Sequence, residues 1–133
     1  MNTRMVPSIL VVDDNDDVRS ALGELLRDEG FDVVEATDGK KALDYLLAAT
    51  TIPSLILLDV NMPVMSGWEV VRALRGHLRF VKLPIILVTG ERRTTTDPAS
   101  QAIVGRLSKP IHPDDLLALV RRHVVEPSLP AAV

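Results

Sequence analysis

A short apolar run that ends in an aspartate constrains this 133-residue chain more than any other feature. Leucine and isoleucine fill positions 55–58, and Asp59 follows them directly. An uninterrupted apolar run of this kind is typical of a strand buried on both faces, as in a parallel sheet. Ligands bind at the carboxyl ends of such strands, so Asp59 is a candidate for chemistry. The turn residues Pro63 and Gly67 predict a loop between Asp59 and the next helix.

Apolar runs alternate with amphipathic segments along the rest of the chain. Strands are predicted over residues 8–12, 32–36, 55–58, 85–88 and 106–108. Helices are predicted over residues 15–29, 98–104 and 113–124. A further helix is predicted after Gly39, with Ala42, Leu43, Leu46 and Leu47 on one face. Another is marked by Trp68, Val71, Leu74 and Leu78. Strands that alternate with helices predict a doubly wound α/β domain with a parallel sheet.

The length and composition bound what such a domain can do. Residues 1–125 are predicted to form one domain, and residues 126–133 a tail or linker stub. The absence of cysteine excludes a disulfide framework and thiolate metal sites. A net charge of -3 gives no general attraction to nucleic acid or to anionic membranes, and no apolar run approaches the length of a membrane span. We therefore expect a cytoplasmic protein that contacts neither nucleic acid nor membrane directly.

Polar residues stand at the carboxyl ends of four predicted strands. Asp13 and Asp14 follow the first strand and Asp59 the third, while Thr89 ends the fourth and Lys109 follows the fifth. The carboxyl ends of parallel strands lie along one edge of the sheet. We therefore expect these side chains to share one pocket, although they are far apart in the sequence.

This ordered set of motifs resembles the receiver domain of two-component response regulators. The resemblance covers roughly residues 8–124 and is carried by Asp13-Asp14, Asp59 with Pro63 and Gly67, Thr89-Gly90 and Lys109-Pro110. It implies a flavodoxin-like fold with strand order 2-1-3-4-5. It also implies a module that takes a phosphoryl group onto Asp59 from a histidine kinase or phosphotransfer protein. An output partner would then bind the face formed by the predicted helix 98–104, strand 106–108 and helix 113–124, and a homodimer is possible.

Phosphoryl transfer to a carboxylate places negative charge among acids that already repel it, so a divalent cation is needed. By the resemblance, Mg²⁺ is held by one or both of Asp13 and Asp14, by the Asp59 side chain and by the backbone carbonyl of Asn61. Lys109 and the Thr89 hydroxyl would contact the phosphoryl oxygens. The resemblance further implies that the Lys109–Pro110 peptide bond is cis.

Plainer interpretations of the same residues remain open. Asp13 and Asp14 are also suited to cap a helix, Asp59 to end a strand in a turn, and Lys109 to a solvated surface. An aspartate-nucleophile phosphatase is a competing function, but Asn61 occupies the position of its usual second acid. A receiver that serves only as a binding scaffold is a third possibility.

Arg106 is the main departure from the receiver pattern. It stands three residues before Lys109, where the family commonly has an aromatic side chain. An aromatic switch at this position is therefore not expected, and the output would depend on Arg106 pairing with an acid or on backbone shifts. The methionines beside the acidic loop are expected to pack, and His77, His112 and His123 to lie at the surface.

Overall fold

The computed structural model of the chain describes residues 6–90 and 101–125. The strands are β1 (Ser8–Val12), β2 (Asp32–Ala36), β3 (Leu55–Asp59), β4 (Ile85–Thr89) and β5 (Gly105–Ser108). The helices are α1 (Asp16–Asp28), α2 (Gly39–Ala48), α3 (Gly67–Arg75), the short 3₁₀ helix η1 (Leu78–Phe80) and α4 (Pro113–His123). All pairings in the sheet are parallel, and the strand order is β2-β1-β3-β4-β5. The predicted doubly wound fold and strand order are confirmed.

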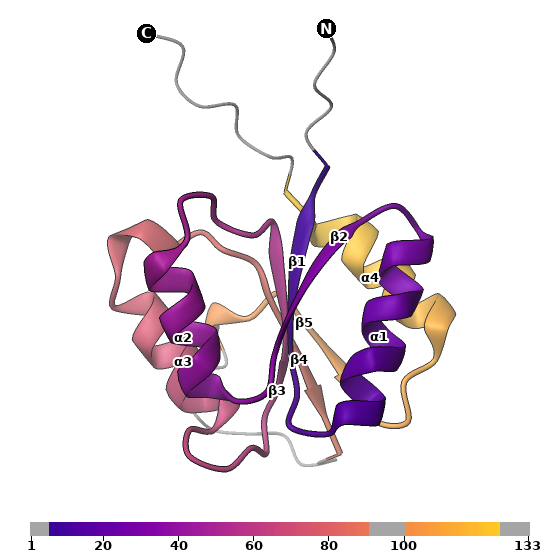
Figure 1. Cartoon of the computed structure of the whole chain (residues 1–133), viewed down its shortest axis with the longest axis horizontal. Coiled ribbons are helices and arrows are strands. Elements are labelled where there is room, and N and C mark those ends of the chain that lie inside the picture. Colours follow the sequence, from indigo (N-terminus) through magenta and orange to yellow (C-terminus); the bar gives the residue numbers. More distant parts are fainter. Residues whose placement is uncertain (1–5, 91–100, 126–133) are drawn as a thin grey trace, which may run out of the picture.

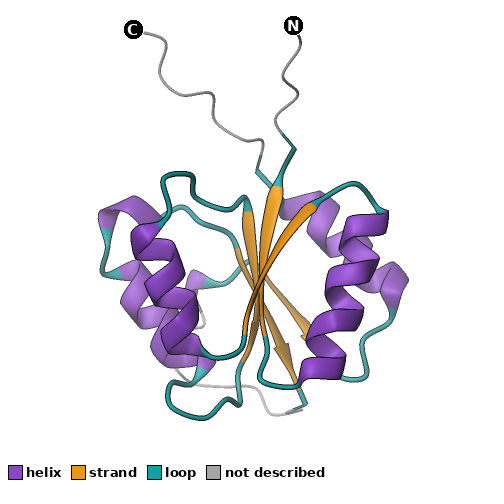
Figure 2. Ribbon diagram, viewed as in Figure 1, coloured by secondary structure: helices purple, strands orange, loops and turns teal. Residues whose placement is uncertain are grey.

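The sheet separates two layers of helices (Figure 1). Helices α2 and α3 cover one face, and α1 and α4 cover the other, as the purple ribbons on either side of the orange strands show in Figure 2. Two separate apolar cores fill the spaces between the sheet and these layers. Each crossover helix therefore buries its apolar stripe against the sheet.

The central strands β1, β3 and β4 are apolar except at one end residue each, because both of their faces are buried. Along β1, Leu10 packs in the core under α2 and α3, whereas Ile9 and Val11 pack in the core under α1 and α4. The same alternation holds in β3, where every residue from Leu55 to Asp59 is buried. A two-sided core explains why the sequence shows continuous apolar runs instead of alternating ones.

The helix ends follow local sequence signals. Asn15 caps α1 by accepting a hydrogen bond from the Val18 amide at 3.0 Å. Gly30 follows this helix with φ of +94°, a conformation that glycine adopts without strain. Ser66 and Glu69 form a capping box at the start of α3. These caps fix where the chain leaves each strand and enters the next helix.

Some sequence predictions differ from the structure. Leu47 and Leu78, predicted to face the core, are 57% and 92% exposed, because α2 presents Leu46 inward and α3 ends before Leu78. Residues 98–100 of the predicted helix over residues 98–104 lie outside the described residues; of the rest, Gln101 and Ala102 are 3₁₀-helical, and Ile103 and Val104 are not helical. The predicted tail over residues 126–133 also lies outside them. No described helix is both long and apolar enough to cross a membrane.

Candidate functional site

Acidic side chains converge at the carboxyl edge of the sheet, where β1 and β3 end side by side. One carboxylate oxygen from each of Asp13, Asp14 and Asp59 lies within 4.8 Å of the others. Asp13 and Asp59 are buried, with 1% and 4% of their surface exposed, while Asp14 is exposed. The structure therefore brings these three side chains together at one edge of the sheet.

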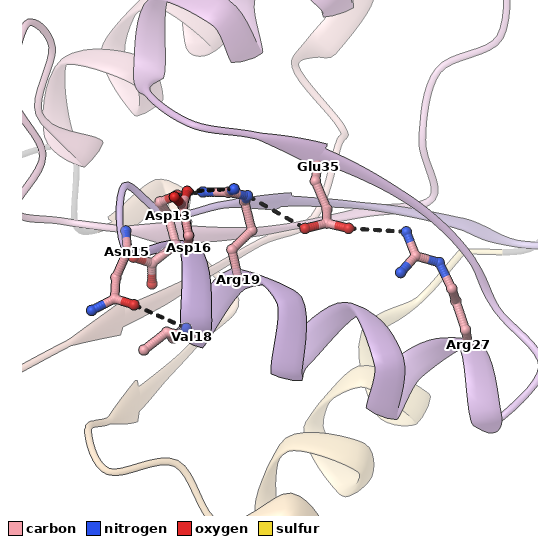
Figure 3. Close-up of polar contacts among 7 residues, drawn as sticks. All are labelled: Asp13, Asn15, Asp16, Val18, Arg19, Arg27 and Glu35. Carbon is pink, nitrogen blue, oxygen red and sulfur yellow. Dashed lines mark hydrogen bonds and ion pairs between the residues drawn. The ribbon is translucent and has the colours of Figure 1, made fainter.

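Asp13 is held by contacts to three of its polar groups. Its amide donates to the Ala36 carbonyl at 3.2 Å, and its Oδ1 accepts from the Asn15 amide at 2.9 Å. Its own carbonyl accepts from Nη1 of Arg19 at 2.9 Å (Figure 3). Its Oδ2 is buried without a hydrogen bond, although the Lys109 ammonium lies 3.1 Å away. One carboxylate oxygen of Asp13 is therefore held in the site by an ion pair with Lys109 and by no hydrogen bond.

Asp59 is the titratable group that this environment perturbs most clearly. Burial raises the pKa of its carboxyl from 3.8 to about 6, and the charges of Asp13 and Asp14 add to the rise. The Lys109 ammonium and a backbone hydrogen bond from Asn61 act in the opposite direction. The effect of burial is larger than that of the lysine, so the net shift is upward. At neutral pH Asp59 is still mostly ionised, as a nucleophilic carboxylate must be.

Lys109 places a cation between two of the acids. Its Nζ lies 3.1 Å from Oδ2 of Asp13 and 3.6 Å from Oδ1 of Asp59. The lysine amide donates to the Thr89 carbonyl at 2.9 Å, which joins the ends of β4 and β5 at this edge. Thr89 is buried at the end of β4, and the Lys109–Pro110 peptide bond is cis, as expected. The structure thus brings Lys109 and Thr89 to the same edge as the acids.

The loop from Asp59 to α3 depends on a close backbone approach. A Cβ at Gly67 would lie 2.4 Å from the Asp59 carbonyl oxygen and 2.9 Å from Cα of Val60. Only glycine fits there, and its amide donates to the Val60 carbonyl at 2.8 Å. Val64, in the same loop, has φ of +69°, an unfavourable conformation for a β-branched residue. Asn61, which stands between Val60 and Val64 in this loop, is exposed.

The residues of the site fit a hard divalent cation. Mg²⁺ prefers carboxylate, carbonyl and water oxygens, and it commonly uses one or two protein carboxylates. Two of the three clustered acids are buried, and like-charged buried acids need a nearby positive charge. The Oδ2 of Asp13, which has an ion pair with Lys109 but no hydrogen bond, is a candidate oxygen ligand. The donor set therefore suits Mg²⁺ and offers no nitrogen or sulfur ligand among the described residues of the cluster.

Two neighbours of the site were not foreseen in the sequence. Asn15, rather than Asp13 or Asp14, caps α1, and its position just before an apolar periodic segment is a usual cap signal. Arg19 joins the Asp13 carbonyl to Glu35 of β2, with Nε 3.3 Å from Oε1 of the glutamate. Only the three-dimensional pairing of α1 with β2 places these two charges together.

Arg106 has a different contact from the one proposed for it. Its guanidinium carbon lies 5.5 Å from the centre of the Trp68 ring, a cation–π contact. Within the described part of the chain it forms no ion pair with an acid. Trp68 is half-buried and packs against the core under α2 and α3, as do Met62 and Met65. His77 and His112 are exposed, and His123 is half-buried.

Comparison with known proteins identifies the family. The family model described as the response regulator receiver domain matches residues 9–121. The chain therefore belongs to the response regulator receiver family. Members of this family are signalling modules that interact with histidine kinases or phosphotransfer proteins, and in general they are not turnover enzymes.

The similar proteins include both longer and comparable chains. The chain is 37% identical over 118 residues to Response regulator Rre1 of Synechocystis sp.; the match covers 86% of this chain but only half of Rre1. It is 31% identical to Protein PilG of Pseudomonas aeruginosa, with 87% of this chain and 86% of PilG covered.

Solved structures show the same fold. Chemotaxis response regulator CheY4 of Vibrio cholerae has a TM-score of 0.82 at 34% identity, over 90% of this chain and 100% of CheY4. The response regulator TrrA of Thermotoga maritima, crystallised in complex with Mg²⁺ and BeF, has a TM-score of 0.80 at 31% identity, over 90% of this chain and 100% of TrrA.

Proposed function

We propose that the chain is a phosphoacceptor receiver of a two-component system, in which Asp59 takes a phosphoryl group from a histidine kinase or phosphotransfer protein. The observation that carries the proposal is the convergence of three carboxylates and one lysine at the carboxyl edge of the sheet. TrrA, a relative of the same fold, was crystallised with Mg²⁺ and BeF. This supports the same class of ligand here.

Asp59 is the nucleophile in this proposal. One carboxylate oxygen attacks phosphorus, the new P–O bond forms as the P–N bond of the phosphohistidine breaks, and the electron pair of that bond returns to the imidazole. No general base is needed because a carboxylate with a pKa near 6 is ionised at neutral pH. Transfer leaves an acyl phosphate on Asp59.

The remaining site residues bind and orient the transferred group. Asp13, Asp14, Asp59 and the backbone carbonyl of Asn61 would hold Mg²⁺, which supplies positive charge for the phosphoryl oxygens. Lys109 already lies beside two of the acids and would form an ion pair with a phosphoryl oxygen. The Thr89 hydroxyl would donate a hydrogen bond to another phosphoryl oxygen.

Output is proposed to pass through the face formed by β5 and α4, while residues 98–100 of the predicted helix before them lie outside the described residues. A pocket of about 630 Å³ lies between β5 and α4, and its lining includes Arg106, His112 and Arg122. An output protein or domain would read the phosphorylated state on this face, and homodimer formation there is a second possibility. We place the receiver domain at residues 1–125, in the cytoplasm, with no direct contact to nucleic acid.

The intact mass of the protein after incubation with acetyl phosphate and Mg²⁺ tests this function. The wild type is expected to gain one phosphate, and the gain should disappear with EDTA and in Asp59→Asn. Asp44→Asn, which changes an exposed aspartate paired with Lys40, is the matched control and should gain phosphate normally. Steady turnover of small phosphoesters would instead indicate an aspartate-nucleophile phosphatase. A folded protein that gains no phosphate from acetyl phosphate or from a phosphorylated histidine kinase would indicate a binding scaffold.

A further inference from the structure

A chain of charged contacts runs from the acidic site across α1 to β2 (Figure 3). Arg19 of α1 donates to the Asp13 carbonyl at 2.9 Å and lies 3.3 Å from Oε1 of Glu35. Arg27, two turns further along the helix, binds the other oxygen of Glu35 at 3.0 Å. Glu35 thus lies between two guanidinium groups, of which only that of Arg19 reaches the site.

The Arg19 side chain is more buried than those of Arg27 and Asp16. Its side chain is 12% exposed, compared with 46% for Arg27 and 82% for Asp16, which Arg19 also contacts at 2.6 Å. Few rotamers are open to a long side chain that is both buried and bound at its end. The guanidinium therefore offers the Asp13 carbonyl a fixed donor, whereas Arg27 is a surface partner of Glu35.

The bond to the Asp13 carbonyl orients both acids of the Asp13-Asp14 pair. A peptide unit is planar, so fixing the Asp13 carbonyl also fixes the direction of the Asp14 amide and the point from which the Asp14 side chain leaves. The Asp13 amide is held by Ala36, and its Oδ1 by the Asn15 amide. With Oδ1 held in this way, the buried Oδ2 points into the site, where it lies 3.1 Å from Nζ of Lys109.

We propose that Arg19, held by Glu35, is a positioning residue for divalent-metal binding by Asp13 and Asp14. This inference rests on the proposed function, since it concerns the metal of the same site. The side chain does not touch the metal in this proposal; it acts through the Asp13–Asp14 peptide. Residues that orient metal ligands in this way typically change metal affinity ten- to a hundredfold when they are replaced.

The direction of the change in metal affinity tests the proposal, because charge alone predicts the opposite direction. Arg19 is a cation near a cation site, so its removal should tighten metal binding if only Coulomb repulsion mattered. If Arg19 positions the acids, its removal should weaken binding. Arg27→Gln removes the same charge from the same helix and also breaks a contact with Glu35, but it leaves the Asp13 carbonyl untouched.

The experiment titrates the wild type, Arg19→Gln, Arg19→Lys and Arg27→Gln with Mn²⁺, which uses the same oxygen ligands as Mg²⁺. Free Mn²⁺ is read from its EPR signal, and Mg²⁺ competition gives the Mg²⁺ affinity. Arg19→Gln is expected to bind about tenfold more weakly. Arg19→Lys keeps the charge but not the planar fork, so its loss should be smaller. Arg27→Gln should match the wild type.

Circular dichroism and urea unfolding show which variants are folded, and Arg19→Lys carries the test if Arg19→Gln does not fold. Arg19 variants that bind the metal as well as or better than the wild type would overturn the proposal. An equal loss in Arg27→Gln would overturn it too, because it would assign the effect to the stability of the α1–β2 contact. A wild type that binds neither ion would instead contradict the proposed function.

Discussion

Asp59 should make the metal-free protein less stable as the pH rises. Burial, with a further contribution from Asp13, raises the pKa of its carboxyl from 3.8 to about 6. Between these values the folded protein holds a proton that the unfolded chain has released. The associated stability is complete below the unfolded pKa and is lost as the pH rises through the folded one. A rise of this size corresponds to about 3 kcal/mol at a pH well above 6.

Asp59→Asn keeps the shape of the side chain and removes this titration. In EDTA at about pH 8, the variant is expected to exceed the wild type by about 3 kcal/mol in free energy of unfolding, and by less than about 1 kcal/mol at about pH 4. Urea unfolding followed by circular dichroism at several pH values measures the difference. Asp44→Asn, at an exposed surface pair, should follow the wild-type pH profile. Parallel pH profiles for Asp59→Asn and the wild type would refute the reasoning.

Three further predictions concern the same edge of the sheet. Val64→Asn should raise the free energy of unfolding by about 1 kcal/mol, seen as a higher urea midpoint, because asparagine tolerates the φ of +69° better than valine; an unchanged or lower midpoint would contradict this. Gly67→Ala should cost about 2–4 kcal/mol and abolish phosphate uptake in the mass assay, since its Cβ would lie 2.4 Å from the Asp59 carbonyl oxygen. Gly90→Ala, where a Cβ would meet nothing within 4 Å, should stay within about 0.5 kcal/mol, and a similar loss in both variants would count against the steric argument. Lys109→Gln removes a cation that lowers the pKa of Asp59, so this pKa should rise further. The free energy of unfolding of the metal-free protein should then fall more steeply with pH. NMR titration of the Asp59 carboxyl measures the pKa, and a lower value than in the wild type would contradict the prediction.

Much of the fold could be predicted because its three central strands, β1, β3 and β4, are buried on both faces. Strands buried on both faces require continuous apolar runs in the sequence, and the residue after each run lies at one edge of the sheet. Asp13, Asp59 and Lys109 could be brought together on this argument alone. The three-residue strand predicted at residues 106–108 was found one residue longer at its start, within the usual uncertainty of strand ends.

The sequence was less informative where contacts between elements decide the structure. Leu78 is apolar and follows the helical spacing of α3, but the helix ends at Arg75. The Arg75 guanidinium donates hydrogen bonds to the carbonyls of Phe80, Val81 and Leu83, in the segment that follows the helix. The Arg19–Glu35 pair depends on the packing of α1 against β2. The Arg106–Trp68 contact likewise joins a residue of β5 to a residue of α3 that lies far from it in the sequence. None of these pairings has a periodic sequence signal.

The central claim is that Asp59 accepts the phosphoryl group, and chemical trapping at that residue tests it most directly. After phosphorylation with acetyl phosphate and Mg²⁺, borohydride reduction converts an aspartyl phosphate to homoserine, which peptide mass spectrometry locates in the sequence. The account predicts homoserine at position 59 and at neither Asp13 nor Asp14. Homoserine at either of those acids instead, with Asp59 unmodified, would contradict it.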